Sequence, residues 1–159
     1  MTDGKVFFNA AEIYEFAVRI EENGEQFYRR VASISEAPKV RELFTLLADE
    51  EIKHKKTFQG LLSKIEQYDP PESYPGEYFE YLRAYADNII FTSLLNKELP
   101  DKIAPAVAVD FGIRRELDSI TYYLEVKNLV PDTQKAKIDA IIEEERRHFL
   151  KLSQLRKTL

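Results

Sequence analysis

The chain contains two histidines, and each lies three residues after a glutamate. His54 follows Glu51 in the stretch EEIKH (50–54), and His148 follows Glu145 in EERRH (144–148). Residues three apart lie on one face of a helix, so the carboxylate and the imidazole of such a pair can reach the same ion. Glutamate is abundant in this chain, and a lone pair of this kind is more often solvated. Because both histidines share the pattern, we interpret it as a metal-ligand motif.

A second feature is an internal repeat that places a further glutamate before each of these motifs. The segment EENGEQFY (21–28) aligns with ELDSITYY (116–123), which matches Glu21 with Glu116. The segment LADEEIKHKKTF (47–58) aligns with IIEEERRHFLKL (141–152), which matches the two Glu-x-x-His motifs. The repeat therefore predicts two helical hairpins of nearly equal length, packed together as a four-helix bundle.

The elements that must position these residues are helices, because glycine is scarce and apolar residues recur at spacings of three and four. We expect a first helix that starts after Asn9, whose side chain can form a capping box with Glu12, and that runs to about residue 34. A second helix should begin at residues 35–38 and run to about Tyr68. Two more are expected over about 102–128 and 133–157, the last capped by Asp132 or Thr133. The proline-rich stretch YDPPESYPG interrupts the pattern. These elements predict one all-α domain that spans residues 1–159. It consists of a first hairpin over 9–68, a partly helical crossover over 69–100 and a second hairpin over 101–159.

Within each expected helix the candidate ligands fall on the apolar, inward-facing stripe. The four stripes are Tyr14, Ala17, Glu21, Gly24, Tyr28 and Val31; Val40, Phe44, Leu47, Glu51, His54, Phe58, Leu61 and Ile65; Val109, Gly112, Glu116, Ser119, Tyr123 and Val126; and Ile138, Ile141, Glu145, His148, Leu152, Leu155 and Leu159. The neighbouring Glu22, Glu25, Arg115 and Asp118 are expected to face away.

Burying four carboxylates together is very unfavourable unless cations neutralise them. No lysine or arginine lies on the four stripes beside them. Four glutamates and two neutral histidines carry a charge of about −4, which two divalent ions balance. The sequence therefore favours a dinuclear metal site, and the alternative is a metal-free bundle with buried polar pairs.

These motifs resemble the rubrerythrin-like branch of the ferritin-like superfamily, over both hairpins. The resemblance implies a ferritin-like bundle in which two iron ions, or manganese or zinc, are bound. The implied ligands are Glu21, Glu51, His54, Glu116, Glu145 and His148, with Glu51 and Glu145 bridging and Glu21 and Glu116 terminal. It also implies that Tyr28 and Tyr123 hydrogen-bond ligand carboxylates and belong, with the four glutamates, to the catalytic centre.

The resemblance implies a non-haem diiron oxidoreductase that reduces hydrogen peroxide or dioxygen. Two departures stand out: the chain has no cysteine, so electrons must come from a separate donor protein, and Ser119 stands where typical rubrerythrins have an extra carboxylate. The alternatives are a ferroxidase or other iron-handling protein, and a non-enzymatic metal-binding bundle.

Composition limits the other function classes. A net charge of −5 argues against nucleic acid and anionic membranes as partners. No apolar run is long enough to span a membrane and no signal peptide is recognisable, so a cytoplasmic location is the default expectation. The crossover aromatics Tyr74, Tyr78, Phe79, Tyr81, Tyr85 and Phe91 either pack on their own bundle or form a homodimer interface, and a homodimer is expected.

Overall fold

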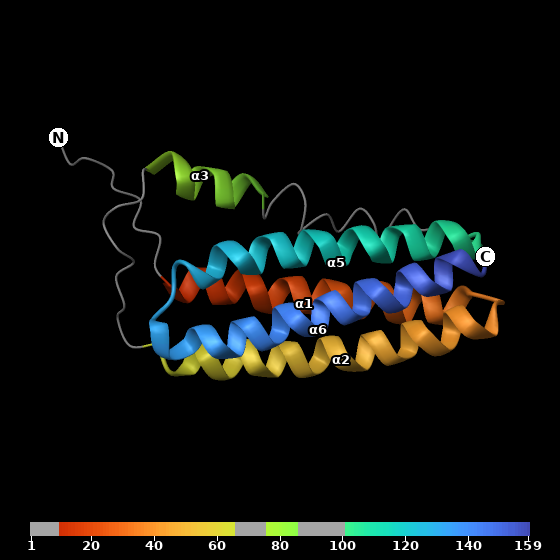
Figure 1. The fold of residues 1–159 in the computed structure, drawn as a ribbon, viewed down its shortest axis with the longest axis horizontal. Coiled ribbons are helices and arrows are strands. Elements are labelled where there is room, and N and C mark those ends of the chain that lie inside the picture. Colours follow the sequence, from red (N-terminus) through yellow and green to blue (C-terminus); the bar gives the residue numbers. More distant parts are fainter. Residues whose placement is uncertain (1–9, 66–75, 86–100) are drawn as a thin grey trace.

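A computed structural model describes residues 10–65, 76–85 and 101–159 of the chain. Four long helices lie alongside one another, and a short helix lies outside them (Figure 1). Their bounds are α1 Ala10–Ile34, α2 Pro38–Ser63, α3 Gly76–Tyr85, α5 Pro105–Lys127 and α6 Asp132–Lys157. The predicted all-α architecture, with a crossover that is at least partly helical, is confirmed.

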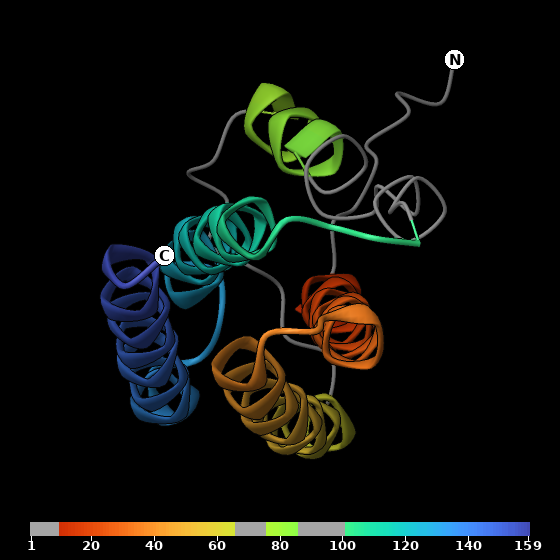
Figure 2. The ribbon, with the colours of Figure 1, turned by 90° about the vertical axis from the view of Figure 1, so that its right-hand side faces the viewer.

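The four long helices occupy the corners of a bundle, as the end-on view in Figure 2 shows. α1 and α2 form one antiparallel hairpin, and α5 and α6 form the other. The hairpins meet along two borders, α1 against α5 and α2 against α6. Each long helix therefore presents one face to a common axis, which is where the sequence places the candidate ligands.

Helix ends differ from the sequence-based expectation in three places. α5 begins at Pro105, not at about residue 102. α2 ends at Ser63, five residues before the predicted end, and Lys64 donates its backbone N–H to the Leu61 carbonyl. Neither Asp132 nor Thr133 caps α6, because its N-cap is Pro131 and Asp132 is already the first helical residue. Proline fixes φ near −65° and so prepares the chain for a helix start without a side-chain cap. The predicted cap at Asn9 lies outside the described residues.

The apolar core consists of two clusters, one on each side of the polar centre. One contains Tyr14, Phe58, Tyr122, Leu129 and Ile138 among others. The other is built around Phe27, Val31, Val40, Phe44 and Leu152. The centre is thus enclosed within the bundle by apolar side chains.

The predicted stripes are buried almost throughout, with three exceptions. Ile65 and Leu155 are only half-buried, and Leu159 is 47% exposed because the helix has ended at Lys157. Glu22, Glu25, Arg115 and Asp118, expected to face away, are all half-buried. The guanidinium of Arg115 lies 5.4 Å from the centre of the Phe27 ring.

Helix α3 packs on its own bundle. Leu82 is 2% exposed and joins the first core cluster. The Tyr85 ring stacks on Tyr122 at 6.3 Å, and its hydroxyl donates to the Asp118 carbonyl at 2.8 Å, whereas Tyr81 is 49% exposed. The side chains of the other crossover aromatics lie outside the described residues, and the homodimer stays a prediction. Across the described parts of the chain, no helix is long and apolar enough to cross a membrane.

Candidate metal centre

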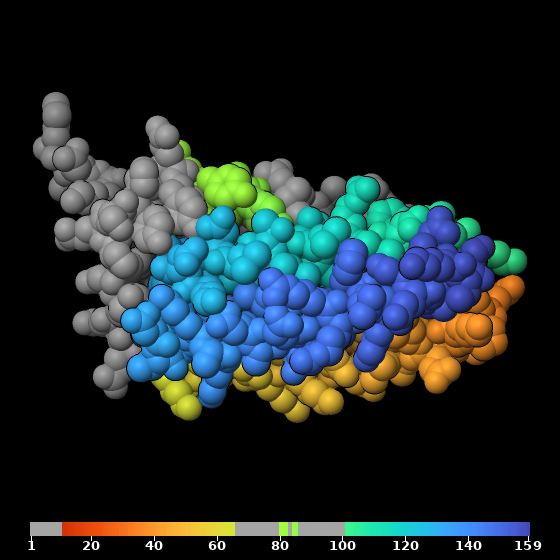
Figure 3. All heavy atoms as spheres, viewed as in Figure 1, coloured from red at the N-terminus to blue at the C-terminus, as the bar shows by residue number. Residues whose placement is uncertain are grey.

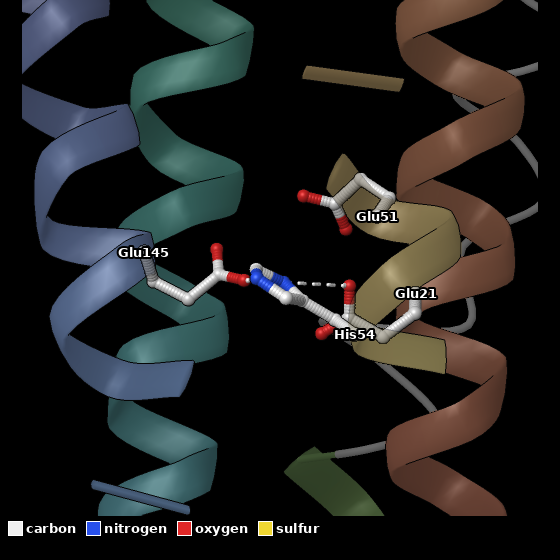
Figure 4. Close-up of side chains that lie close together, drawn as sticks. All are labelled: Glu21, Glu51, His54 and Glu145. Carbon is white, nitrogen blue, oxygen red and sulfur yellow. Dashed lines mark ion pairs between the residues drawn. The ribbon is translucent and has the colours of Figure 1, made fainter. Parts of the chain in front are cut away.

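At mid-bundle, the six predicted ligands form two overlapping groups that could each hold a metal ion. The first group is Glu21, Glu51, His54 and Glu145, shown in Figure 4; the second is Glu51, Glu116, Glu145 and His148. Within each group the potential ligand atoms lie within 4.8 Å of one another. Glu51 and Glu145 belong to both groups, and their role as bridging ligands stays a prediction.

The histidines approach the carboxylates through Nδ1. His54 Nδ1 lies 2.7 Å from Glu145 Oε1 and 3.5 Å from Glu21 Oε2. His148 Nδ1 lies 3.6 Å from Glu116 Oε1 and 3.8 Å from Glu145 Oε2. The two imidazole rings are stacked with centres 5.6 Å apart. Each hairpin therefore supplies the centre with one terminal glutamate and one Glu-x-x-His pair.

Several polar atoms of the centre are buried and make no hydrogen bond of good geometry, although His54 Nδ1 lies close to a carboxylate oxygen. They are Oε2 of Glu21, Oε2 of Glu116, Oε1 of Glu145, and Nδ1 of both His54 and His148. Leaving a buried polar atom without a good hydrogen bond costs roughly 1–3 kcal/mol, and His54 Nδ1 lies within 3.5 Å of two of the other atoms, Glu21 Oε2 and Glu145 Oε1. Oxygen and nitrogen donors in this number suit a pair of divalent transition-metal ions. The residues present therefore fit a dinuclear metal site.

Without metal, protons must neutralise this cluster, and the pKa shifts show where they reside. Burial raises the pKa of Glu145 to about 8, and neighbouring carboxylates add to the effect. Burial and the charge of Glu21 likewise raise the pKa of Glu51 well above its ordinary value. Burial alone would lower the histidine pKa values, but the adjacent carboxylates raise them to about 12 for His54 and about 10 for His148. The metal-free centre holds protons at the positions that metal ions would occupy.

The remaining two glutamates behave differently. Burial would raise the pKa of Glu21 and of Glu116, but close contacts with the protonated neighbours hold both pKa values below the ordinary range. Two ionised carboxylates then face two imidazolium rings.

The two predicted tyrosines contact the centre from across the bundle. Tyr28 on α1 donates its hydroxyl to Glu116 on α5, and Tyr123 on α5 donates to Glu21 on α1. Burial raises both tyrosine pKa values well above 10, and the carboxylates raise them further, so both phenols keep their protons and remain donors. Each tyrosine thus fixes the terminal glutamate of the opposite hairpin and not the glutamate of its own helix.

Two glutamates that sequence reasoning missed hold the outer nitrogens of the histidines. Glu144 Oε2 on α6 lies 2.5 Å from His54 Nε2 on α2, and Glu50 Oε2 on α2 lies 2.5 Å from His148 Nε2 on α6. A carboxylate on one ring nitrogen keeps the proton there and leaves the other nitrogen available as a ligand. The signal was present in the repeat, which aligns Glu50 with Glu144 immediately before the two ligand glutamates.

Gly24 provides the space for the Glu51 carboxylate. A Cβ atom at this position would lie 2.6 Å from Glu51 Oε2 and 3.2 Å from Arg115 Nη2. Its counterpart in the repeat, Ser119, is 8% exposed and lies one turn after Glu116. The centre is therefore symmetric in its candidate ligands but not in the residues that pack against them.

Comparisons with known proteins found one matching family model and one similar solved structure. The model of the family described as Rubrerythrin matches residues 12–156. A solved structure from Thermotoga maritima, of a candidate ferritin-like diiron-carboxylate protein, superposes with a TM-score of 0.67 at 24% identity, covering 95% of this chain and 96% of that one. This similarity shows a ferritin-like fold. A comparison with curated proteins gave no match.

Proposed function

Because the chain belongs to the rubrerythrin family, we propose that it is a non-haem diiron oxidoreductase that reduces hydrogen peroxide, or dioxygen, with electrons from a separate donor protein. The observation that carries the proposal is the pair of overlapping Glu/His groups, which share Glu51 and Glu145 in a buried centre. Such a centre holds two metal ions close enough to act together on one small molecule.

The residues of the chain have separate roles in this proposal. Glu21 and His54 would hold one ion, Glu116 and His148 would hold the other, and Glu51 and Glu145 would be shared by both. Iron bound there would supply the two electrons that reduce an O–O bond. Hydrogen peroxide then takes up two protons and leaves as two water molecules.

The surrounding residues keep the geometry fixed while charge changes at the centre. Tyr28 and Tyr123 restrain the terminal carboxylates, and Glu50 and Glu144 restrain the imidazoles. The carboxylates of Glu51 and Glu145 have no such partner outside the centre among the described residues, so they are the groups able to shift as the metal charge changes. The two apolar core clusters exclude bulk water.

A ferroxidase is the second candidate, and Ser119 is the observation that favours it. This residue, buried one turn after Glu116, stands where the rubrerythrin resemblance predicts an additional carboxylate. The six candidate ligands that remain also suit a centre whose substrate is Fe(II). A non-enzymatic zinc or manganese bundle is the third candidate.

Metal analysis followed by stopped-flow kinetics separates these candidates. Purified protein is assayed for metal, loaded anaerobically with Fe(II), and mixed with hydrogen peroxide or with oxygen. About two metal ions per chain and faster oxidation by peroxide than by oxygen are expected. Preference for oxygen, with continued turnover of added Fe(II), would establish the ferroxidase. Binding of metal without reaction with either oxidant would establish the non-enzymatic bundle.

A further inference from the structure

A polar pocket of about 250 Å³ lies at the surface between α2 and α6. Figure 3 shows α6, in blue, lying alongside α2, in orange to yellow, on this side of the bundle. The pocket is lined by Glu50, Lys53, Glu144, Arg147 and Lys151. None of these residues is a candidate metal ligand, and the proposed reaction assigns nothing to the three cations.

The inner wall of the pocket connects directly to the metal centre. Glu144 and Glu50 are the two carboxylates that contact Nε2 of His54 and of His148, each at 2.5 Å. Their side chains are 44% and 25% exposed, whereas the histidine side chains are 3% and 1% exposed. Glu144 and His54 therefore connect the pocket to one proposed metal position, and Glu50 and His148 connect it to the other.

The pocket also carries three cationic side chains beside these two carboxylates. Lys53, Arg147 and Lys151 are exposed, and none makes an ion pair within the described part of the chain. The three cations outnumber the two carboxylates of the pocket, which disfavours it as the route for Fe(II). They attract an anionic partner, although the whole chain carries a net charge of −5.

Exposed apolar side chains lie beside the cations. Leu46, one turn before Glu50 on α2, is 42% exposed, and Leu150, one turn after Arg147 on α6, is 54% exposed. Because α2 and α6 are antiparallel, both leucines lie toward the same end of the pocket. Cations around a small apolar area suit a brief, electrostatically steered encounter with a protein better than the capture of a small ion.

We propose that this α2–α6 pocket is the docking site of an acidic one-electron donor protein, which reduces the metal pair through the Glu144–His54 and Glu50–His148 contacts. The proposal rests on the proposed function. Two reduced donor molecules dock in turn, and each is oxidised by one electron. The two electrons restore the reduced metal pair that one molecule of hydrogen peroxide, taking up two protons, had oxidised.

The test uses the metal-loaded protein, oxidised with peroxide, and reduced plant-type [2Fe–2S] ferredoxin as an acidic donor. The variant Lys53→Glu/Arg147→Glu/Lys151→Glu is compared with Lys39→Glu/Lys102→Glu/Lys137→Glu, which has the same net charge but changes exposed lysines that do not line the pocket. In low salt, the pocket variant should be reduced at least roughly tenfold more slowly than the control, and the difference should shrink at about 0.5 M salt. Equal rates for the two variants would overturn the proposal.

Direct binding makes the result independent of the peroxide reaction. Oxidised ferredoxin is titrated against each metal-loaded variant, with Lys53→Gln/Lys151→Gln as a milder variant if the triple change lowers metal content. If only the pocket variants bind ferredoxin more weakly, the docking proposal is supported. If peroxide also fails to react with the metal-loaded protein, the proposed function fails while docking stands. Peroxide reaction with no pocket-dependent ferredoxin binding would leave the function and refute docking. Pocket-dependent binding of inorganic phosphate but not ferredoxin would also refute it.

Discussion

Gly24 is the residue at which a single added methyl group should reach the metal centre. In Gly24→Ala the new Cβ would lie 2.6 Å from Glu51 Oε2, too close for the carboxylate to stay in place. Because that carboxylate is the far end of a flexible side chain, it can move without unfolding the protein. We expect the helix to remain intact and metal affinity to fall about tenfold, measured by competition with a chelator.

Gly60 provides the matched control on α2. A Cβ atom there would meet no other atom within 4 Å, and the residue is exposed. Gly60→Ala should therefore stabilise the protein by about 0.5–1 kcal/mol, since alanine favours the helix, and should leave metal affinity unchanged. If Gly24→Ala bound metal as tightly as Gly60→Ala, Glu51 would not be a ligand in the position that the structure gives it.

The protonated residues of the centre predict proton release on metal binding. At pH 7, His54 and His148, with pKa values raised to about 12 and about 10, hold protons, as does Glu145 with a pKa of about 8. Glu51, whose pKa is also raised, holds another. Two divalent ions must displace these protons, about four per chain, so metal affinity should increase as pH rises from 6 to 8.

Calorimetry in buffers of different ionisation enthalpy measures that release. The control is Glu51→Ala, in which one of the protonated groups is absent and metal binding should be lost or greatly weakened. An affinity independent of pH, without heat from the buffer, would mean that the metal-free centre is not protonated as the structure indicates.

The six candidate ligands could be predicted because their spacing places them on the stripes of their own helices. Glu50 and Glu144 were missed although the repeat aligns them, because each lies beside the stripe and contacts its histidine on the opposite hairpin. The hydrogen-bond acceptor of each tyrosine could not be predicted from spacing. Spacing relates Tyr28 to Glu21 on the same helix, whereas the Tyr28 hydroxyl contacts Glu116. Contacts within a helix follow from its period, and contacts between helices require their arrangement in space.

At the scale of the elements, the two Glu–His contacts join α2 to α6 where the hairpins meet. Glu144→Gln removes the charge that holds the proton on His54 Nε2 while keeping a side chain of the same size. Nδ1 should then be a poorer ligand, and metal affinity should fall roughly 10-fold to 100-fold. Glu50→Gln should act in the same way on His148, since the two contacts are equivalent in the repeat.

Glu143→Gln is the control for these substitutions. Glu143 is exposed and pairs with Arg146 on its own helix, so it contributes nothing to the histidines. Chelator competition and the ¹⁵N chemical shifts of the imidazoles report affinity and tautomer separately. Unchanged imidazole shifts in Glu144→Gln and Glu50→Gln would show that these carboxylates do not position the rings.

Helix existence could be predicted more reliably than helix ends. The start of α6 depends on Pro131, whose fixed φ replaces the side-chain cap that Asp132 or Thr133 was expected to supply. At the end of α2, the apolar period continues to Ile65 although the helix stops at Ser63. A hydrophobic period indicates which face is buried, but it does not specify the residue at which backbone hydrogen bonding ends.

For the whole molecule, the repeat was sufficient to predict two hairpins and one shared centre. It carried no information on the division of the core into two apolar clusters, or on Tyr14 of α1 donating to Gln134 of α6 at 2.6 Å. The centre is the most polar part of the interior and lies between those clusters. The stability of the bundle should therefore depend on what neutralises the centre.

The metal-free protein should lose stability as pH rises. In the folded state Glu145 and His148 keep protons up to pKa values of about 8 and about 10, but in the unfolded chain they release them near their ordinary values of 4.5 and 6.5. Over that interval the folded state binds more protons than the unfolded state, so raising the pH favours unfolding. The metal-loaded protein has no such protons to lose and should gain stability as binding tightens.

Thermal unfolding at pH 6 and pH 8.5, with chelator or with two equivalents of metal, tests these opposite effects of pH on the stability of the metal-free and the metal-loaded protein. The Tm of the metal-free protein should fall by on the order of 5 °C between the two pH values, whereas the Tm of the loaded protein should hold or rise. Glu51→Ala, which removes a ligand of both groups, should show the same Tm with and without metal. If the wild-type Tm did not respond to metal at pH 8.5, where the centre most needs positive charge, the dinuclear assignment would be wrong, and the buried carboxylates would be neutralised by protons alone.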